Sequence, residues 1–236
     1  MASSEAPVPV APENLRPGQL GVVMLGRVVI ADIAVTLVDL CVRDFIQVKT
    51  VPGADAGSDW SLRQRPATAS PRGRASLLGY EEMLLAGLPF QRGACNLSSL
   101  PGQAAHLLDA TRSAVVRDSV HRGWLRHLDH HQRTEKGEEL AGNVRVFRGR
   151  LRHFVSGQAA RAVPDELLPY ALRFGFMARD DAPLVQFAHA WVEAFADLPG
   201  WQAPAPEPRR PAPEYGPLLN NDDEMSRQIA RAAFWL

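Results

Sequence analysis

Apolar residues in the first part of the chain recur at helical spacing and then at strand spacing. From position 30 they return every three or four residues, which predicts an amphipathic helix with Asp32 and Asp39 on its polar face. Its apolar members are Ile30, Ile33, Ala34, Leu37, Val38, Cys41 and Val42. The pattern then changes, and the next apolar positions, Phe45, Ile46, Val48 and Val51, predict a strand. Residues 60–65 are expected to return as its hairpin partner.

A short helix expected over 17–27 precedes this segment. The predicted order is therefore helix, helix, two-stranded hairpin, which is typical of a winged-helix unit. The alternative that fits the same pattern is an ordinary small α+β unit without a recognition helix.

The second half of the chain carries mainly helical periodicity. Helices are expected over 77–89, 101–128 and 133–157, and the last has a core face in which Leu140, Val144, Phe147 and Leu151 follow at spacings of four, three and four. The stretch 96–100 is interpreted as a second, degenerate wing. The predicted fold class is thus α+β, predominantly helical.

Proline-rich stretches mark the predicted boundaries. The expected organisation is a disordered N-terminus (1–16), a winged-helix-like unit (17–66), a linker (67–76), a helical domain (77–202), a Pro-rich linker (203–217) and a C-terminal helix (218–236).

Composition excludes some functions and favours a compartment. The 26 basic and 26 acidic residues balance, so there is no overall charge that favours nucleic acid or an anionic membrane. Two cysteines do not make a disulfide framework, and no secretory signal or apolar stretch of about 20 residues is present. We therefore expect a soluble cytoplasmic protein. The preference for arginine over lysine indicates a GC-rich bacterial genome.

Motifs for catalysis or nucleotide binding are missing from the sequence. It contains no nucleophile elbow, no P-loop and no strand-anchored dinucleotide fingerprint, so an enzyme is not expected and no cofactor is predicted. His127, His130 and His131 form a weak metal-binding candidate, which would support a small metalloenzyme. A solvent-exposed polar helix end explains the same residues.

Residues 112–161 are locally basic, with eleven Arg or Lys against five Asp or Glu. The candidate basic patch consists of Arg117, Arg122, Arg126, Arg148 and Arg152, and it supports the alternative of a winged-helix DNA-binding regulator. Asp32 and Asp39 on the helix that would enter the groove oppose this alternative, because they would repel phosphates. A solvated surface balanced by acids elsewhere is the simpler interpretation.

Five segments that follow one another in the chain carry a resemblance to a known family. They are DIAVTLVDLCVRDFIQV, LLGYEEMLLAGL, RGWLRH, KGEELAGNVRVFRGRLRHF and LPYALRFGF. In this order they resemble the soluble cytoplasmic part of a bacterial family of predicted membrane proteins, domain of unknown function 2207, over about 16–201. Asp44 stands where that family usually has Gly, and the chain looks like a detached soluble copy. The resemblance implies no reaction.

Within LPYALRFGF, Pro169 is expected to begin a helix whose aromatic residues pack inward while Arg173 faces out. Six aromatic residues are candidates for contact with a partner: Tyr170, Phe174, Trp191, Trp201, Phe234 and Trp235. The sequence therefore predicts a non-enzymatic interaction module that binds a protein or peptide through the hairpin, the aromatic residues or the C-terminal helix.

Overall fold

The structure, a computed structural model, describes residues 7–53, 57–66, 76–90, 93–128, 132–157, 163–177 and 182–201. Its helices and strands follow in the order α1 (Leu20–Leu25), α2 (Ile30–Val42), β1 (Ile46–Pro52), β2 (Ser58–Gln64), α3 (Gly79–Gly87), β3 (Cys95–Asn96), α4 (Ala105–His121), α5 (Glu135–Gly157), α6 (Leu168–Arg173) and α7 (Pro183–Ala194). Short 3-10 helices lie at η1 (Pro12–Asn14), η2 (Pro17–Gln19), η4 (Leu97–Ser99) and η5 (Asp165–Leu167).

The strands form one small antiparallel sheet in the order β1-β2-β3. Strands β1 and β2 make the predicted hairpin, in register from Ile46 opposite Gln64 to Pro52 opposite Ser58. Strand β3 adds to β2 through Leu62 opposite Cys95. The α+β, mainly helical class is therefore confirmed. The second wing expected over 96–100 is wrong, because this stretch ends β3 in the first sheet and continues into η4.

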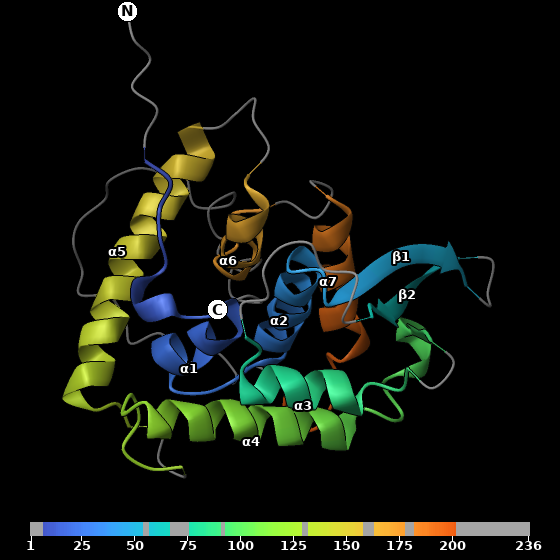
Figure 1. The fold of residues 1–236 in the computed structure, drawn as a ribbon, viewed down its shortest axis with the longest axis horizontal. Coiled ribbons are helices and arrows are strands. Elements are labelled where there is room, and N and C mark those ends of the chain that lie inside the picture. The colour runs from blue at the N-terminus through green and yellow to red at the C-terminus, as the bar shows by residue number, and fades with distance from the viewer. Residues whose placement is uncertain are drawn as a thin grey trace, which may run out of the picture.

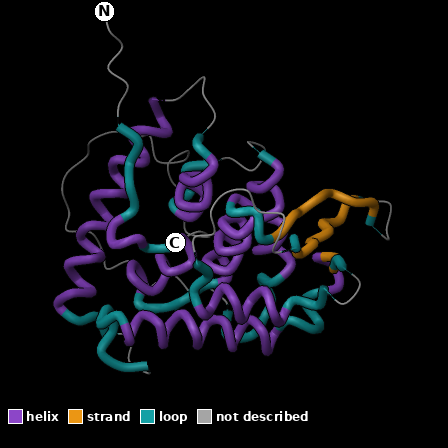
Figure 2. Tube along the Cα trace, viewed as in Figure 1, coloured by secondary structure: helices purple, strands orange, loops and turns teal. Residues whose placement is uncertain are grey.

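Figure 1 shows the hairpin projecting on one side of the molecule and α5 lying along the opposite side, with α3 and α4 side by side below. Figure 2 shows that helices make up most of the body between these two sides. No helix in the described ranges is long and apolar enough to cross a membrane.

Helix α2 is the centre of the fold, and its polar face is buried as well. The expectation that Asp32 and Asp39 face solvent is wrong: Asp32 is 0 % exposed, and Asp39 and Thr36 are also buried. The reason is that η2, α6 and α7 all pack against α2 and together cover more than its apolar side. The carboxylate of Asp32 accepts hydrogen bonds from the N–H groups of Gly21 and Val29, at 3.0 and 2.8 Å.

Arg173 completes this buried polar contact and corrects a second expectation. Its side chain does not face out but is 3 % exposed, and its Nε donates to Asp32 Oδ1 at 2.6 Å. The other expectations for this segment are confirmed: Pro169 lies in the first turn of α6, and Phe174 is buried. Helix α6 ends at Arg173, and Gly175, two residues further on, has a φ of 72° that favours glycine.

Two apolar clusters make up the core. One surrounds α2 and includes residues of α3, α4, α7 and the sheet, and the other lies between α1, α5 and α6. The predicted core face of α5 is confirmed, because Leu140, Val144, Phe147 and Leu151 are all buried. Both clusters draw residues from 17–66 and from 77–202. The described end of the segment predicted to be disordered, 7–16, contributes Leu15, which is buried.

Candidate anion-binding pocket

The predicted aromatic residues lie in different parts of the molecule. Trp191 is 0 % exposed in the first cluster, where its ring lies 4.7 Å from that of Phe195. Tyr170 and Phe174 belong to the second cluster, where both contact Phe147 at centroid distances of 5.4 and 6.1 Å. These rings therefore pack within the protein's own core, in two separate clusters, and do not line one shared pocket.

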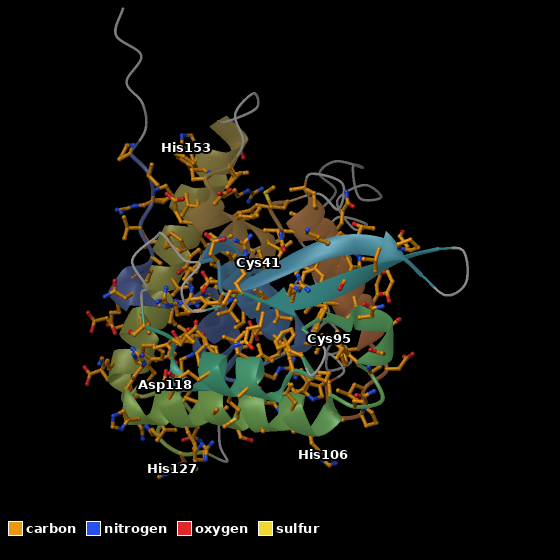
Figure 3. The ribbon with its side chains drawn as sticks, turned by 45° about the vertical axis from the view of Figure 1, so that its right-hand side comes forward. Cys41, Cys95, His106, Asp118, His127 and His153 are labelled. Atoms are coloured by element: carbon orange, nitrogen blue, oxygen red, sulfur yellow. The ribbon has the colours of Figure 1, made fainter. Side chains whose placement is uncertain are left out.

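The remaining predicted residues fall on several surfaces or outside the structure. Phe234, Trp235, His130 and His131 lie outside the described residues. Figure 3 shows His106, His127 and His153 well separated from one another. Among the described residues, no group of three or more His, Cys, Asp or Glu is placed to hold a metal ion.

The predicted basic patch is divided. Arg122 pairs with Asp118 at 2.8 Å and lies over the Trp124 ring. Arg126 follows α4, whereas Arg148 and Arg152 lie on α5. Only Arg117 lies in the pocket described next, and Trp201 is the one predicted aromatic residue that joins it there.

A pocket of about 470 Å³ opens between the α1–α2 connection, α4 and the chain after α7. Its size falls within the usual range for ligand sites, about 300–1,000 Å³. Its polar lining consists of Arg27, Arg112, Ser113 and Arg117, and its apolar lining of Val28, Val29, Val116, Leu128 and Trp201. We call it the anion pocket.

Local structure explains how these residues meet. Helix α1 ends at Gly26, whose φ of 71° reverses the chain and starts the connection that carries Arg27 and Val28. On α4, Arg112 and Val116 are one turn apart, as are Ser113 and Arg117, so all four share one face.

Trp201 is held in position by polar contacts on two sides. Its Nε1–H donates to Asp109 Oδ1 at 3.0 Å, and the guanidinium of Arg112 lies 4.5 Å from the ring centroid. Arg112 also donates to the same Asp109 oxygen at 2.7 Å and to the Gly200 carbonyl at 2.8 Å. The tryptophan wall of the pocket is thus fixed before any ligand arrives, and the charge of Arg112 is partly compensated by Asp109.

Two of the three guanidinium groups in the pocket have no hydrogen-bonding or ionic partner among the described residues. Within the described ranges, Arg27 and Arg117 form no hydrogen bond or ion pair, and no carboxylate lines the pocket. The Ser113 hydroxyl donates to the Asp109 carbonyl at 2.9 Å. Beside these charges lie buried Val28 and Val116, and Leu128 is 49 % exposed at the rim. This arrangement suits a ligand that combines an anionic group with an apolar body.

One cluster of ionisable groups, which includes Asp39 with its perturbed pKa, lies away from the pocket and joins α2 to α3. Arg43 pairs with Asp39 at 2.8 Å and with Glu81 at 2.7 Å, and Glu81 accepts the Leu78 N–H at the start of α3. Burial raises the pKa of Asp39 to about 6, against the opposing effect of Arg43. This cluster ties two helices together and does not line the anion pocket.

Neither thiol is activated. Cys41 and Cys95 are free, and burial raises their pKa values to about 12 and about 11. Both remain protonated at neutral pH, which disfavours a nucleophilic or metal-binding thiolate.

Sequence reasoning missed Arg27, Arg112, Ser113, Val116 and Leu128 as site residues. The one signal present was the spacing on α4, where Arg112 and Val116, and Ser113 and Arg117, are each four positions apart. Nothing local to Arg27 or Leu128 indicated that they would face the same cavity.

Comparison of the chain with protein families, with curated proteins and with solved structures found no match. The family resemblance described above therefore remains a prediction.

Proposed function

We propose that this protein is a non-enzymatic interaction module that binds an acidic peptide segment of a partner protein in the anion pocket. The observation that carries the proposal is the pair of uncommitted guanidinium groups, Arg27 and Arg117, beside an apolar floor and a fixed tryptophan.

The chemistry of the pocket favours a carboxylate next to an apolar side chain. Guanidinium groups bind carboxylates through two parallel hydrogen bonds, and these bonds are among the stronger ones in proteins. An apolar or aromatic side chain on the same peptide would cover Val116, Leu128 and the Trp201 ring. A volume of about 470 Å³ accommodates a few side chains, which is the scale of a peptide anchor rather than a whole domain.

If the N-terminal elements form a winged-helix unit, that unit would act here as a scaffold for the pocket and not as a DNA reader. In that interpretation helix α2, which precedes the β1–β2 hairpin, would be the groove-reading helix. Its polar residues Asp32, Thr36 and Asp39 are buried, which disfavours DNA reading by α2. Packed in this way, α2 instead supports the turn that presents Arg27 and Val28.

The test is fluorescence anisotropy with a short fluorescein-labelled peptide that has a Glu-Phe-Asp core, compared with a Gln-Phe-Asn peptide of the same length. We expect binding of the acidic peptide and a loss of tenfold or more in Arg27→Gln/Arg117→Gln, because each charge-assisted hydrogen bond contributes about 1.5–3 kcal/mol. The matched control is Arg145→Gln/Arg150→Gln, which removes two exposed arginines from α5 and should leave peptide affinity unchanged.

Two results would overturn the proposal. One is equal affinity for the acidic and neutral peptides, and the other is an acidic-peptide affinity that the pocket variant leaves unaltered. Inorganic phosphate provides a further arm: a pocket that binds phosphate and neither peptide belongs to a small-anion receptor instead.

A further inference from the structure

Beyond its first turns, which carry the exposed Glu135, Glu138 and Glu139, the outward face of α5 carries only positive charge. Between Leu140 and Gly157 the helix has four arginines and His153, and no Asp or Glu. The arginines are Arg145, Arg148, Arg150 and Arg152. The opposite side of the helix is buried against α1, η1 and α6, so the charged side chains point away from the core. Three of the four are exposed, and Arg148 is half-buried.

These arginines have no acidic partner among the described residues. Within the part of the chain that the structure describes, none of the four forms an ion pair, and the guanidinium of Arg148 lies 5.7 Å from the centroid of the Phe174 ring. Burial, followed by the charges of Arg152 and Arg173, lowers the pKa of Arg148. A concentration of uncompensated cations on one helix is slightly unfavourable by itself, and an anionic partner would remove that repulsion.

The backbone of this face is open to close approach. Gly142 and Gly149 lie two turns apart on α5, and a Cβ at either position would meet nothing within 4 Å. Glycine in a helix interior costs about 1 kcal/mol relative to alanine. No contact in the described structure accounts for that cost. Arg145 and Arg152 flank the glycines on one side and Arg150 on the other, roughly 140° around the axis from Arg145 by helix geometry.

From the charge of this face we propose that α5 binds the phosphate backbone of duplex nucleic acid, without regard to sequence. Arg145 and Arg152 are about 10 Å apart along the helix axis. A major groove about 12 Å wide admits an α-helix, so arginines on both flanks of α5 reach the phosphates that border the groove. Contacts of this kind position a protein on the duplex and carry no base specificity.

An acidic protein surface fits this face less well. Its only exposed large apolar residue among those described on α5 is Val146, at 54 %. A partner helix would therefore gain little hydrophobic free energy, and exposed ion pairs contribute only about 0–1 kcal/mol each. A nucleic acid gains from counterion release at every phosphate that is neutralised. The α5 face shares no residue with the anion pocket, so this inference does not rest on the proposed peptide binding.

The test is anisotropy of a fluorescein-labelled random-sequence duplex DNA of about 20 base pairs, at about 50 and 200 mM salt. With four phosphates contacted, the affinity should fall about a hundredfold between the two salt concentrations. Arg145→Gln/Arg150→Gln should weaken binding and lower the slope of log affinity against log salt by about 2. Arg145→Lys/Arg150→Lys should retain the slope, because lysine also neutralises phosphate, and circular dichroism should show equal helix content in all variants.

Three results would overturn the inference. They are no binding at about 50 mM salt, a salt slope unchanged in Arg145→Gln/Arg150→Gln, and binding of polyglutamate in place of the duplex. Arg27→Gln/Arg117→Gln serves as the control and should leave duplex affinity and its salt slope intact. The two variant pairs thus separate a failure of this inference from a failure of peptide binding.

Discussion

The buried contact between Asp32 and Arg173 offers the sharpest test of how the core is held together. Arg173→Met removes the guanidinium and keeps an apolar side chain of similar length. The Asp32 carboxylate then retains only the N–H groups of Gly21 and Val29 and loses the Arg173 donor at 2.6 Å. Both side chains are almost fully buried, so water does not replace the lost partner.

The expected cost follows from that burial. Removing one partner of a buried ion pair destabilises a protein by about 3–5 kcal/mol, because the other charge stays behind without compensation. In a chain of this size each kcal/mol shifts the melting temperature by about 2–4 °C. Arg173→Met should therefore melt about 6–20 °C below the parent. Burial also raises the pKa of Asp32 against the effect of Arg173, so losing the arginine raises it further.

Urea denaturation of four proteins measures the effect: the parent, Arg173→Met, Asp32→Asn and the double variant. We expect the double variant to be less destabilised than the sum of the two single variants by more than about 1 kcal/mol, because the residues contact each other. Arg152→Met on the exposed face of α5 is the matched control and should lie within about 0.5 kcal/mol of the parent. A cost below about 1 kcal/mol for Arg173→Met, or additive single changes, would refute the reasoning.

Three further predictions concern pH, helix glycines and the N-terminal segment. Burial raises the pKa of Asp39 from 3.8 to about 6, so the folded chain binds a proton more tightly and this contribution to stability is lost as pH rises from about 4 to 6. Asparagine does not titrate, so Asp39→Asn should not lose stability in this way. Urea melts should therefore show the free energy of unfolding of Asp39→Asn, relative to that of the parent, rising by up to about 3 kcal/mol between about pH 4 and about pH 6. A difference between the two proteins that stays constant with pH would contradict this. A Cβ at Gly137 would overlap the carbonyl oxygen of Trp124, so Gly137→Ala should lower the free energy of unfolding by about 1–3 kcal/mol. A Cβ at Gly149 meets nothing, so Gly149→Ala should raise the free energy of unfolding by up to about 1 kcal/mol. Thermal melts in which Gly137→Ala is the more stable of the two would contradict this prediction. Tyr170→Phe removes the hydroxyl that donates to the Leu15 carbonyl at 2.6 Å, at a cost of about 1 kcal/mol, and hydrogen exchange of the segment around Leu15 should quicken while that of α4 does not.

Local periodicity was enough to predict much of the secondary structure. The core face of α5 and the β1–β2 hairpin are as predicted, because each depends on neighbours within one or two turns or across one short turn. The mainly helical class follows for the same reason.

The same reasoning failed where an element is surrounded on several sides. Periodicity shows which face of a helix is more apolar, and Asp32 and Arg173 were accordingly expected in solvent. It does not show how many other elements will cover that helix. Asp32 and Arg173, which are 141 positions apart in the chain, pair with each other. This pairing offsets the cost of burying both charged side chains in the core.

What the sequence by itself determined is most of the helices in the described part of the chain, the hairpin and the balance of charges. What only the tertiary structure decided is where those charges lie. Arg27 and Arg117, far apart in the chain, meet at one cavity beside Trp201, while the α5 arginines remain on an open face. The physical reason is that secondary structure depends on short-range contacts along the chain. A pocket depends on which distant surfaces the collapse of two apolar clusters brings together.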